Sequence, residues 1–192
     1  MLETGTCRML TGVTPEKVWT VGHSNRPLEE LVRLLQAHGV DLLVDVRTVP
    51  RSGYNPQFNR EALPTPLAEA GIAYLHMPGL GGLRHARPDS PNTGWRNLSF
   101  RGYADYMQTP EFKAHLDELA AQATTRRTAI MCAESVPWRC HRSLIADALT
   151  ARGIPVDHIM SATKANPHRL TSFAVVDGTR VTYPGETPSL FD

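Results

Sequence analysis

The chain has 192 residues and a formal net charge of +1, with 41% hydrophobic and 20% charged residues. This balance is typical of a soluble globular protein and argues against both a disordered chain and a general nucleic-acid coat. No apolar run is long enough to span a membrane and no secretory signal is visible. We therefore expect a cytoplasmic protein with no membrane partner.

Strands and helices are predicted to alternate along one α/β domain at residues 17–183. Apolar runs of strand length lie at 18–22, 41–46, 72–76, 128–133 and 155–159, and helical patterns lie at 27–38, 65–70, 109–123 and 142–152, with a helical turn at 103–108. An Asp-Gly pair predicts a β-hairpin at 173–183. We expect residues 1–16, which include Cys7, to form a loose N-terminal lead-in, and we expect residues 184–192 to form a polar tail. The alternation predicts a mainly parallel sheet flanked by helices.

Two connections carry more specific predictions. The helix at 65–70 is expected to use Thr65 as its cap, because Pro64 makes an earlier start unfavourable. The polar segment that follows Gly82 is too long for a plain connection, and such segments are usually lids, binding loops or disordered. Its arginines are Arg84, Arg87, Arg96 and Arg101.

Polar residues and glycines follow each of the first four predicted strands. In parallel sheets, ligands bind beyond the carboxyl ends of the strands. We therefore expect one composite pocket at this edge. Its residues are Gly22, His23, Ser24 and Asn25 after the first strand, Asp45, Arg47 and Arg51 at the second, Gly79, Gly81 and Gly82 after the third, and Glu134, Arg139, Cys140, His141 and Arg142 after the fourth.

Five separated motifs match the pattern of a known family. They are Thr20–Arg26, Asp45–Arg47 with Pro50 and Ser52, Asn55–Asn59, Arg101–Tyr106, and Cys132-x-Glu134 leading to Cys140–Arg142. From about Val18 to Ile159, the chain resembles the bacterial and archaeal family catalogued as domain of unknown function 488. The resemblance implies a compact α/β domain, and it implies no particular activity.

The first hypothesis for the pocket is a site for a phosphate-bearing ligand, such as a nucleotide or a nucleic-acid end. Most of the basic residues are arginines, which form forked bonds with phosphate. The predicted helix start at Cys140 adds free N–H groups and a positive dipole end. The candidate ligand-binding residues are Ser24, Asn25, Arg47, Arg51, Arg101, Tyr103, Arg139, His141 and Arg142. The alternative is that the arginines form a structural network with Asp45, Glu61 and Glu134.

The second hypothesis is nucleophilic or redox chemistry at Cys140. A cysteine at a helix N-terminus beside cationic side chains should have a lowered pKa. His141 is expected to point elsewhere, on the apolar stripe of its helix, so His23 is the better candidate base. Neither cysteine has the five-residue spacing to an arginine that a phosphatase loop needs, and Cys132 and Cys140 do not form a CxxC pair. Cys132 is expected to be a small buried residue at a strand end. The catalytic candidates are Cys140, His23, Glu134 and Asp45.

The third hypothesis is a divalent metal. The ligand types are acceptable, but no paired spacing such as CxxC or HxxxH supports the site, so the cofactor stays open. The candidate ligands are His23, Asp45, Glu134, Cys140 and His141. Five other histidines are expected to be ordinary surface or loop residues, namely His38, His85, His115, His158 and His168.

Aromatic residues lie in the same loops, and these can stack nucleobases or cover the sheet edge as a small satellite core. They are Tyr54, Phe58, Trp95, Tyr103 and Tyr106, and a core position is expected for Phe58 and Tyr103.

The leading prediction is an enzyme that acts on a phosphorylated or nucleotide-like substrate. The alternative is a non-catalytic module that binds a nucleotide or nucleic acid.

Overall fold

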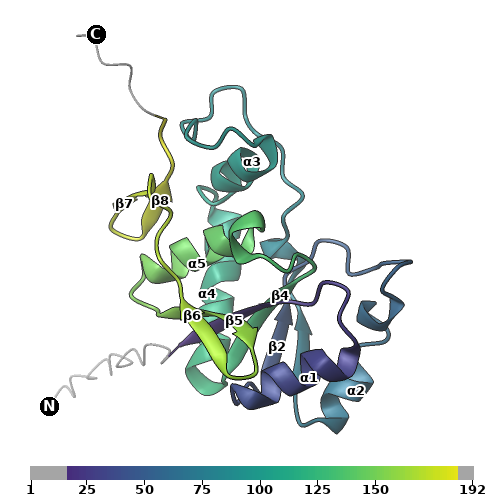
Figure 1. The fold of residues 1–192 in the computed structure, drawn as a ribbon. Coiled ribbons are helices and arrows are strands. Elements are labelled where there is room, and N and C mark those ends of the chain that lie inside the picture. The colour runs from purple at the N-terminus through teal and green to yellow at the C-terminus, as the bar shows by residue number, and fades with distance from the viewer. Residues whose placement is uncertain (1–16, 186–192) are drawn as a thin grey trace, which may run out of the picture.

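The computed structural model describes residues 17–185, and within them a six-stranded sheet forms the centre of the fold (Figure 1). The strands run in the order β3-β2-β4-β1-β5-β6. Their bounds are β1 Val18–Gly22, β2 Leu42–Asp45, β3 Ala73–His76, β4 Thr128–Cys132, β5 Val156–Ser161 and β6 Lys164–Pro167. The first five strands are parallel, and β6 is antiparallel to β5. A separate hairpin joins β7 (Val175–Asp177) to β8 (Arg180–Thr182). The predicted α/β fold with a C-terminal hairpin is confirmed.

The central strands are apolar because helices cover both faces of the sheet. One face packs on α1 (Leu28–Ala37) and α2 (Pro64–Glu69), and the other on α3 (Leu98–Tyr106), α4 (Pro110–Thr125) and α5 (Arg142–Thr150), as Figure 1 shows. Short 3₁₀ helices η1 (Pro56–Phe58), η2 (Pro78–Leu80) and η3 (Pro137–Arg139) lie in the connections. Each face therefore has its own hydrophobic core.

The strand order creates a crevice at the carboxyl end of β4. This strand lies between β1 and β2, so it separates two strands that are consecutive in the chain. The chain leaves β1 and β2 toward α1 and α2 on one face, whereas it leaves β4 toward α5 on the other. Neighbouring strands whose connections part in this way leave an opening beyond their carboxyl ends. The fold thus places a crevice next to the chain that follows Cys132.

Several local predictions need correction. Helix α3 begins at Leu98, earlier than the predicted turn at 103–108, because the Asn97 side chain accepts hydrogen bonds from the first amides of the helix. Helix α2 begins at Pro64, and no side chain caps it, so Thr65 is not its cap. Proline is tolerated at a first helical position, where its missing N–H leaves no bond unmade. Strand β6 was not predicted, since Lys164–Pro167 is a polar edge strand without an apolar pattern.

The long segment between η2 and α3 is held by a buried carboxylate. Asp105 of α3 accepts hydrogen bonds from the Ser90 hydroxyl at 2.5 Å, the Asn92 amide at 2.8 Å and the Arg87 main-chain N–H at 2.8 Å. Arg84 stacks on the Tyr106 ring, 3.5 Å from its centroid. These bonds order a segment that has no regular structure of its own.

Two predictions concern residues beyond the described range. The lead-in at 1–16, with Cys7, and most of the predicted tail, at 186–192, lie outside the described residues. No helix of the described chain has the length and apolar character that a membrane crossing needs.

Candidate functional site

A cleft of about 640 Å³ opens at the carboxyl edge of the sheet. Its walls come from the segments that follow β1, β2, β3 and β4, together with the first turn of α3. The lining residues are Ser24, Arg47, Thr48, Val49, Gly82, Leu83, Ser99, Phe100, Cys132, Ala133, Glu134, Ser135, Arg139, Cys140 and His141. Seven of these fifteen residues belong to the pocket expected from the sequence, namely Ser24, Arg47, Gly82, Glu134, Arg139, Cys140 and His141.

The end of β4 is fixed between its two neighbours. The main-chain N–H of His23 donates to the Cys132 carbonyl at 3.0 Å, and the N–H of Val46 donates to the Met131 carbonyl at 3.0 Å. Gly22 is required here, because a Cβ on this residue would lie 2.0 Å from the carbonyl oxygen of Glu134. The turn after β4 therefore lies directly against the end of β1, and this contact shapes one wall of the cleft.

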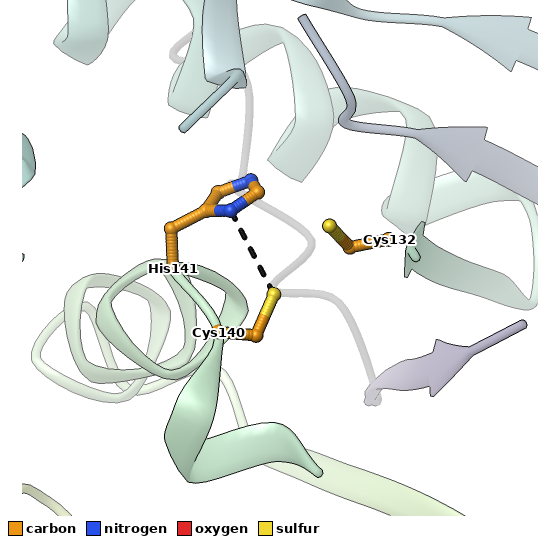
Figure 2. A group of neighbouring side chains, drawn as sticks. All are labelled: Cys132, Cys140 and His141. Carbon is orange, nitrogen blue, oxygen red and sulfur yellow. Dashed lines mark hydrogen bonds between the residues drawn. The ribbon is translucent and has the colours of Figure 1, made fainter. Parts of the chain in front are cut away.

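Two cysteines and a histidine meet in the cleft wall (Figure 2). The Cys140 sulfur lies 3.7 Å from His141 Nδ1, and these two atoms and the Cys132 sulfur all lie within 4.8 Å of one another. Cys132 is the last residue of β4, whereas Cys140 and His141 directly precede α5. The side chain of Cys140 is 4% exposed, and Cys132 is half-buried. The cluster thus faces the cleft from a largely buried position.

The imidazole of His141 has a defined tautomer. Its Nε2 lies 3.2 Å from the Val46 carbonyl oxygen, and a carbonyl can only accept, so Nε2 carries the proton. The lone pair on Nδ1 therefore faces Cys140. Gly82 packs on the other side of the ring, and a Cβ there would lie 2.6 Å from Nδ1. The expectation that His141 points away from Cys140 is wrong, because His141 precedes the first residue of α5 and does not lie on its apolar stripe.

The surroundings of Cys140 favour its thiolate. The Cys132 thiol donates a hydrogen bond that lowers the pKa of Cys140 well below its usual value; burial acts in the opposite direction, and His141 and Arg142 lower the pKa further. Arg142 Nε donates to the Cys140 sulfur at 3.4 Å. The hydrogen bond to Cys140 and burial raise the pKa of Cys132. Of the two cysteines, Cys140 is therefore the one that loses its proton more readily.

The predicted base His23 has a different role in this structure. Its Nδ1 donates to the Ser24 carbonyl at 2.7 Å, its Nε2 accepts from Arg47 at 3.1 Å, and its ring stacks on Phe58. Burial, followed by the charge of Arg47, lowers the pKa of His23 to about 4. Both ring nitrogens are occupied, so the base that faces Cys140 is His141.

Asp45 and Arg47 form a buried ion pair. Arg47 donates from Nε and Nη2 to the two carboxylate oxygens at 2.8 and 2.6 Å, and its Nη2 also donates to the Phe58 carbonyl at 2.7 Å. Tyr74 donates to the same carboxylate at 2.8 Å. The guanidinium of Arg47 is thus occupied, as the structural-network alternative requires, although the residue still lines the cleft.

The other predicted arginines divide into bound and open side chains. Arg142 is 1% exposed, and its guanidinium donates to the carbonyls of Glu134 and Ser135. Arg101 donates to the Trp95 carbonyl at 3.0 Å and lies outside the cleft, as does the exposed Arg51. Arg139 is exposed, lines the cleft and has no ion-pair partner among residues 17–185. It is the cationic side chain most open to a ligand.

The remaining candidates differ in their access to the cleft. Glu134 and Ser24 line it, and the Glu134 carboxylate accepts from the Val136 N–H at 3.0 Å. Ser24 has a positive φ of 52°, an uncommon conformation for a non-glycine residue. Asn25 is exposed beside it. Tyr103 belongs to the core and donates to the Leu80 carbonyl at 2.8 Å.

A family model described as Domain of unknown function DUF488 matches residues 27–149. The chain belongs to this family. The match runs from the start of α1 almost to the end of α5 and includes the whole cluster of Cys132, Cys140 and His141. No curated protein and no solved structure matches the chain. The predicted resemblance is confirmed, and the DUF488 description assigns no activity to the cluster.

The residue types of the cluster could also hold a metal ion, but the set differs from the predicted one. Cys132, Cys140 and His141 combine two thiols and an imidazole with a free lone pair, which are ligands of zinc. His23 and Asp45, which were predicted as ligands, bind Arg47 instead.

Sequence reasoning missed Cys132 as the partner of Cys140. Eight positions separate the two residues, and no standard motif has this spacing. The signal available was topological, because the last residue of a parallel strand and the first residues of the next helix lie at the same sheet edge. Gly82 was placed at this edge correctly, but its contact with His141 depends on the course of a distant loop.

Proposed function

We propose that the cleft is the active site of an enzyme in which the Cys140 thiolate attacks a phosphorylated or nucleotide-like substrate. One alignment of groups supports this proposal. The Cys140 sulfur lies 3.7 Å from His141 Nδ1, and His141 Nε2 lies 3.2 Å from the Val46 carbonyl oxygen. A nucleophile, a base and a third group that orients the base form the arrangement that activated cysteines use.

His141 Nδ1 takes the proton of Cys140, and the sulfur forms a bond to an electrophilic centre of the substrate as the bond to the leaving group breaks. The imidazolium then gives its proton to the leaving group. Water later cleaves the bond to sulfur and restores the thiol. The hydrogen bond between His141 and Val46 keeps the ring in the tautomer that this sequence of transfers needs.

The cleft supplies groups that favour an anionic substrate. Arg139 is a charged donor that is not occupied within the described chain, and the positive end of α5 lies beside Cys140. Val49 and Leu83 are 62% and 74% exposed and line the same cleft, so they offer apolar surface to the organic part of a ligand. This combination suits a small phosphorylated molecule better than a long nucleic acid.

The experiment measures the alkylation of Cys140 by iodoacetamide across pH, with mass spectrometry to locate the label. We expect an apparent pKa below the ordinary cysteine value of about 8.5. A mixture of nucleoside 5′-monophosphates should protect the thiol, and Arg139→Gln should abolish this protection without slowing alkylation. Arg51→Gln is the matched control, because Arg51 is an exposed arginine outside the cleft.

The outcomes separate the possible functions of the cleft. An ordinary pKa together with no protection would overturn the proposal. Protection without turnover of any nucleotide in the mixture would favour the non-catalytic binding module. Stoichiometric zinc in the purified protein, lost in Cys132→Ser, would show that the cluster holds a metal rather than a free thiolate.

A further inference from the structure

A series of buried hydrogen bonds, which lies outside the cleft, connects a carboxylate on α5 to the Cys140 sulfur. It starts at Asp147, which is 0% exposed and accepts from His168 Nε2 at 2.8 Å. His168 Nδ1 lies 3.0 Å from His158 Nε2, and His158 Nδ1 lies 2.7 Å from the Thr20 hydroxyl. The next residue in this series of hydrogen bonds is Arg142, which like Asp147 belongs to α5.

Arg142 joins this chain to the reactive sulfur. Its Nη1 donates to the Thr20 hydroxyl oxygen at 3.4 Å, and its Nε donates to the Cys140 sulfur at 3.4 Å. The guanidinium is also held by the carbonyl of Glu134. The position of Arg142 against Cys140 therefore depends on how Thr20 presents its oxygen.

With both histidines neutral, the carboxylate at one end determines the direction of every bond in this series. A carboxylate only accepts and a guanidinium only donates, so Asp147 fixes the proton of His168 on Nε2. A neutral His168 then accepts at Nδ1 from His158 Nε2, and His158 accepts at Nδ1 from the Thr20 hydroxyl. The Thr20 hydrogen points to His158, which leaves an oxygen lone pair for Arg142. Each residue thus fixes the orientation of the next.

The groups around His158 and His168 favour these hydrogen-bond directions. Burial is the main cause that lowers the pKa of His158 to about 4; the charge of Arg142 acts in the same direction, and Asp157 and Asp147 oppose it. Lys17 on β1 pairs with Asp157 at 2.6 Å. Asp147 accepts three further bonds, from the Thr171 N–H and hydroxyl and from the Tyr183 hydroxyl. The expectation of an ordinary surface or loop residue is therefore wrong for His158, which is buried on β5, whereas His168 lies in the loop after β6 with its side chain 5% exposed.

A second cavity, of about 400 Å³, gives access to this chain from the other side of η3. His158 and His168 line it, together with Pro137 and Trp138 of η3, whereas Arg139 of the same short helix lines the first cleft. The two cavities thus share η3 as a wall.

We propose that Asp147, His168, His158 and Thr20 are positioning residues that hold the Arg142 guanidinium against the Cys140 sulfur. The proposal rests on the proposed function only in taking Cys140 as the reactive group. None of the four residues lines the first cleft. They act through Arg142, and their contribution is to keep a positive charge beside the sulfur, which favours the thiolate.

The test replaces Thr20 and follows the pH profile of Cys140 alkylation by iodoacetamide. Thr20→Val keeps the shape of this buried side chain but removes the hydroxyl, whereas Thr20→Ser keeps the hydroxyl. We expect Thr20→Val to move the profile to higher pH and to slow alkylation at pH 6 by about tenfold, which corresponds to about one pKa unit. Thr20→Ser should keep the profile of the natural protein.

Two further variants locate the effect in the chain. His168→Leu should also shift the profile, whereas His85→Leu, which replaces an exposed histidine outside this series of hydrogen bonds, should leave it unchanged. Nitrogen NMR of the histidine rings should find the protons of His158 and His168 on Nε2. Unchanged profiles in both Thr20→Val and His168→Leu, with both proteins folded, would overturn the proposal, as would protons on the opposite ring nitrogens. These readouts need no substrate, so they stand if nucleotides fail to protect Cys140.

Discussion

Two polar groups follow parallel strands at the same sheet edge, yet their environments differ. After β2, Asp45 and Arg47 are buried and form a forked ion pair that Tyr74 and His23 complete. After β4, Cys140 and His141 face a cleft, and His141 keeps an unused lone pair next to the sulfur. Completed bonds produce a scaffold, whereas an incomplete set beside an opening leaves a group free to react. Position at the functional edge therefore does not by itself identify a catalytic residue.

The largest expected effect is the loss of the proposed nucleophile, Cys140. Cys140→Ser should lower turnover by about a thousandfold or more, because a hydroxyl at this position is a far weaker nucleophile than a thiolate. Cys132→Ala is the matched control, and it should retain turnover with a pH profile shifted upward, since it removes the thiol hydrogen bond to Cys140. Steady-state rates from pH 5 to pH 9 measure both. Equal losses in the two variants would contradict separate roles for the thiols.

When the buried ion pair of Asp45 and Arg47 is broken, we expect a loss of stability instead. Arg47→Ala should lower the free energy of unfolding by about 3–5 kcal/mol, because it leaves the buried Asp45 carboxylate without its charge partner. Arg139→Ala, which removes an exposed arginine of the same cleft, should change stability by less than about 0.5 kcal/mol. Urea unfolding measures both free energies. A comparable loss in Arg139→Ala would remove the distinction between bound and open arginines.

Acid should weaken the completed region. The pKa of His23 is about 4 in the folded protein, below the ordinary value of 6.5, so the unfolded chain binds more protons between these two pH values. The stability that comes from neutral His23 is therefore present at pH 7 and is lost as the pH falls from about 6.5 to about 4, by about 3 kcal/mol at about 1.4 kcal/mol per pKa unit. Urea unfolding at several pH values gives the slope. His23→Gln should flatten it, and His85→Gln, which replaces an exposed histidine, should not.

A smaller effect on turnover is expected when the His141 ring is displaced but not removed. Gly82→Ala places a methyl group 2.6 Å from the original position of His141 Nδ1, so the ring must shift relative to Cys140. We expect about a tenfold loss of turnover with little change in substrate affinity. Gly53→Ala is the control, because nothing lies within 4 Å of a Cβ there. Steady-state kinetics of the two variants decide between displacement of the ring and a general effect of added methyl groups.

The sequence was sufficient for the sheet and for the edge where the cleft lies. Continuous apolar runs predict β1, β2 and β4, and the parallel arrangement places the following residues together. It was not sufficient for the partner of each side chain. Arg47 and Arg139 have the same residue type and the same predicted edge, but only a folded structure shows that one is neutralised by a carboxylate two positions away.

Burial by distant segments explains the other failures. His158 lies on β5 and becomes buried only because β6 and the chain that follows it carry His168 over α5. The polar sequence of β6 gives no signal of its own. Cys132 ends an apolar strand and was read as core, since its contact with Cys140 depends on how η3 folds back.

The place of β4 in the sheet has a consequence for the synthesis of the protein on the ribosome. Strands β1 and β2 appear early in the chain, but they do not pair with each other, and β4 must insert between them. Their facing edges therefore stay without hydrogen-bond partners until Thr128–Cys132 has emerged. The same insertion brings Cys132 to the crevice, and Cys140 follows eight positions later in the chain. The sheet and the thiol pair are thus completed together, and a nascent chain that stops before β4 has neither.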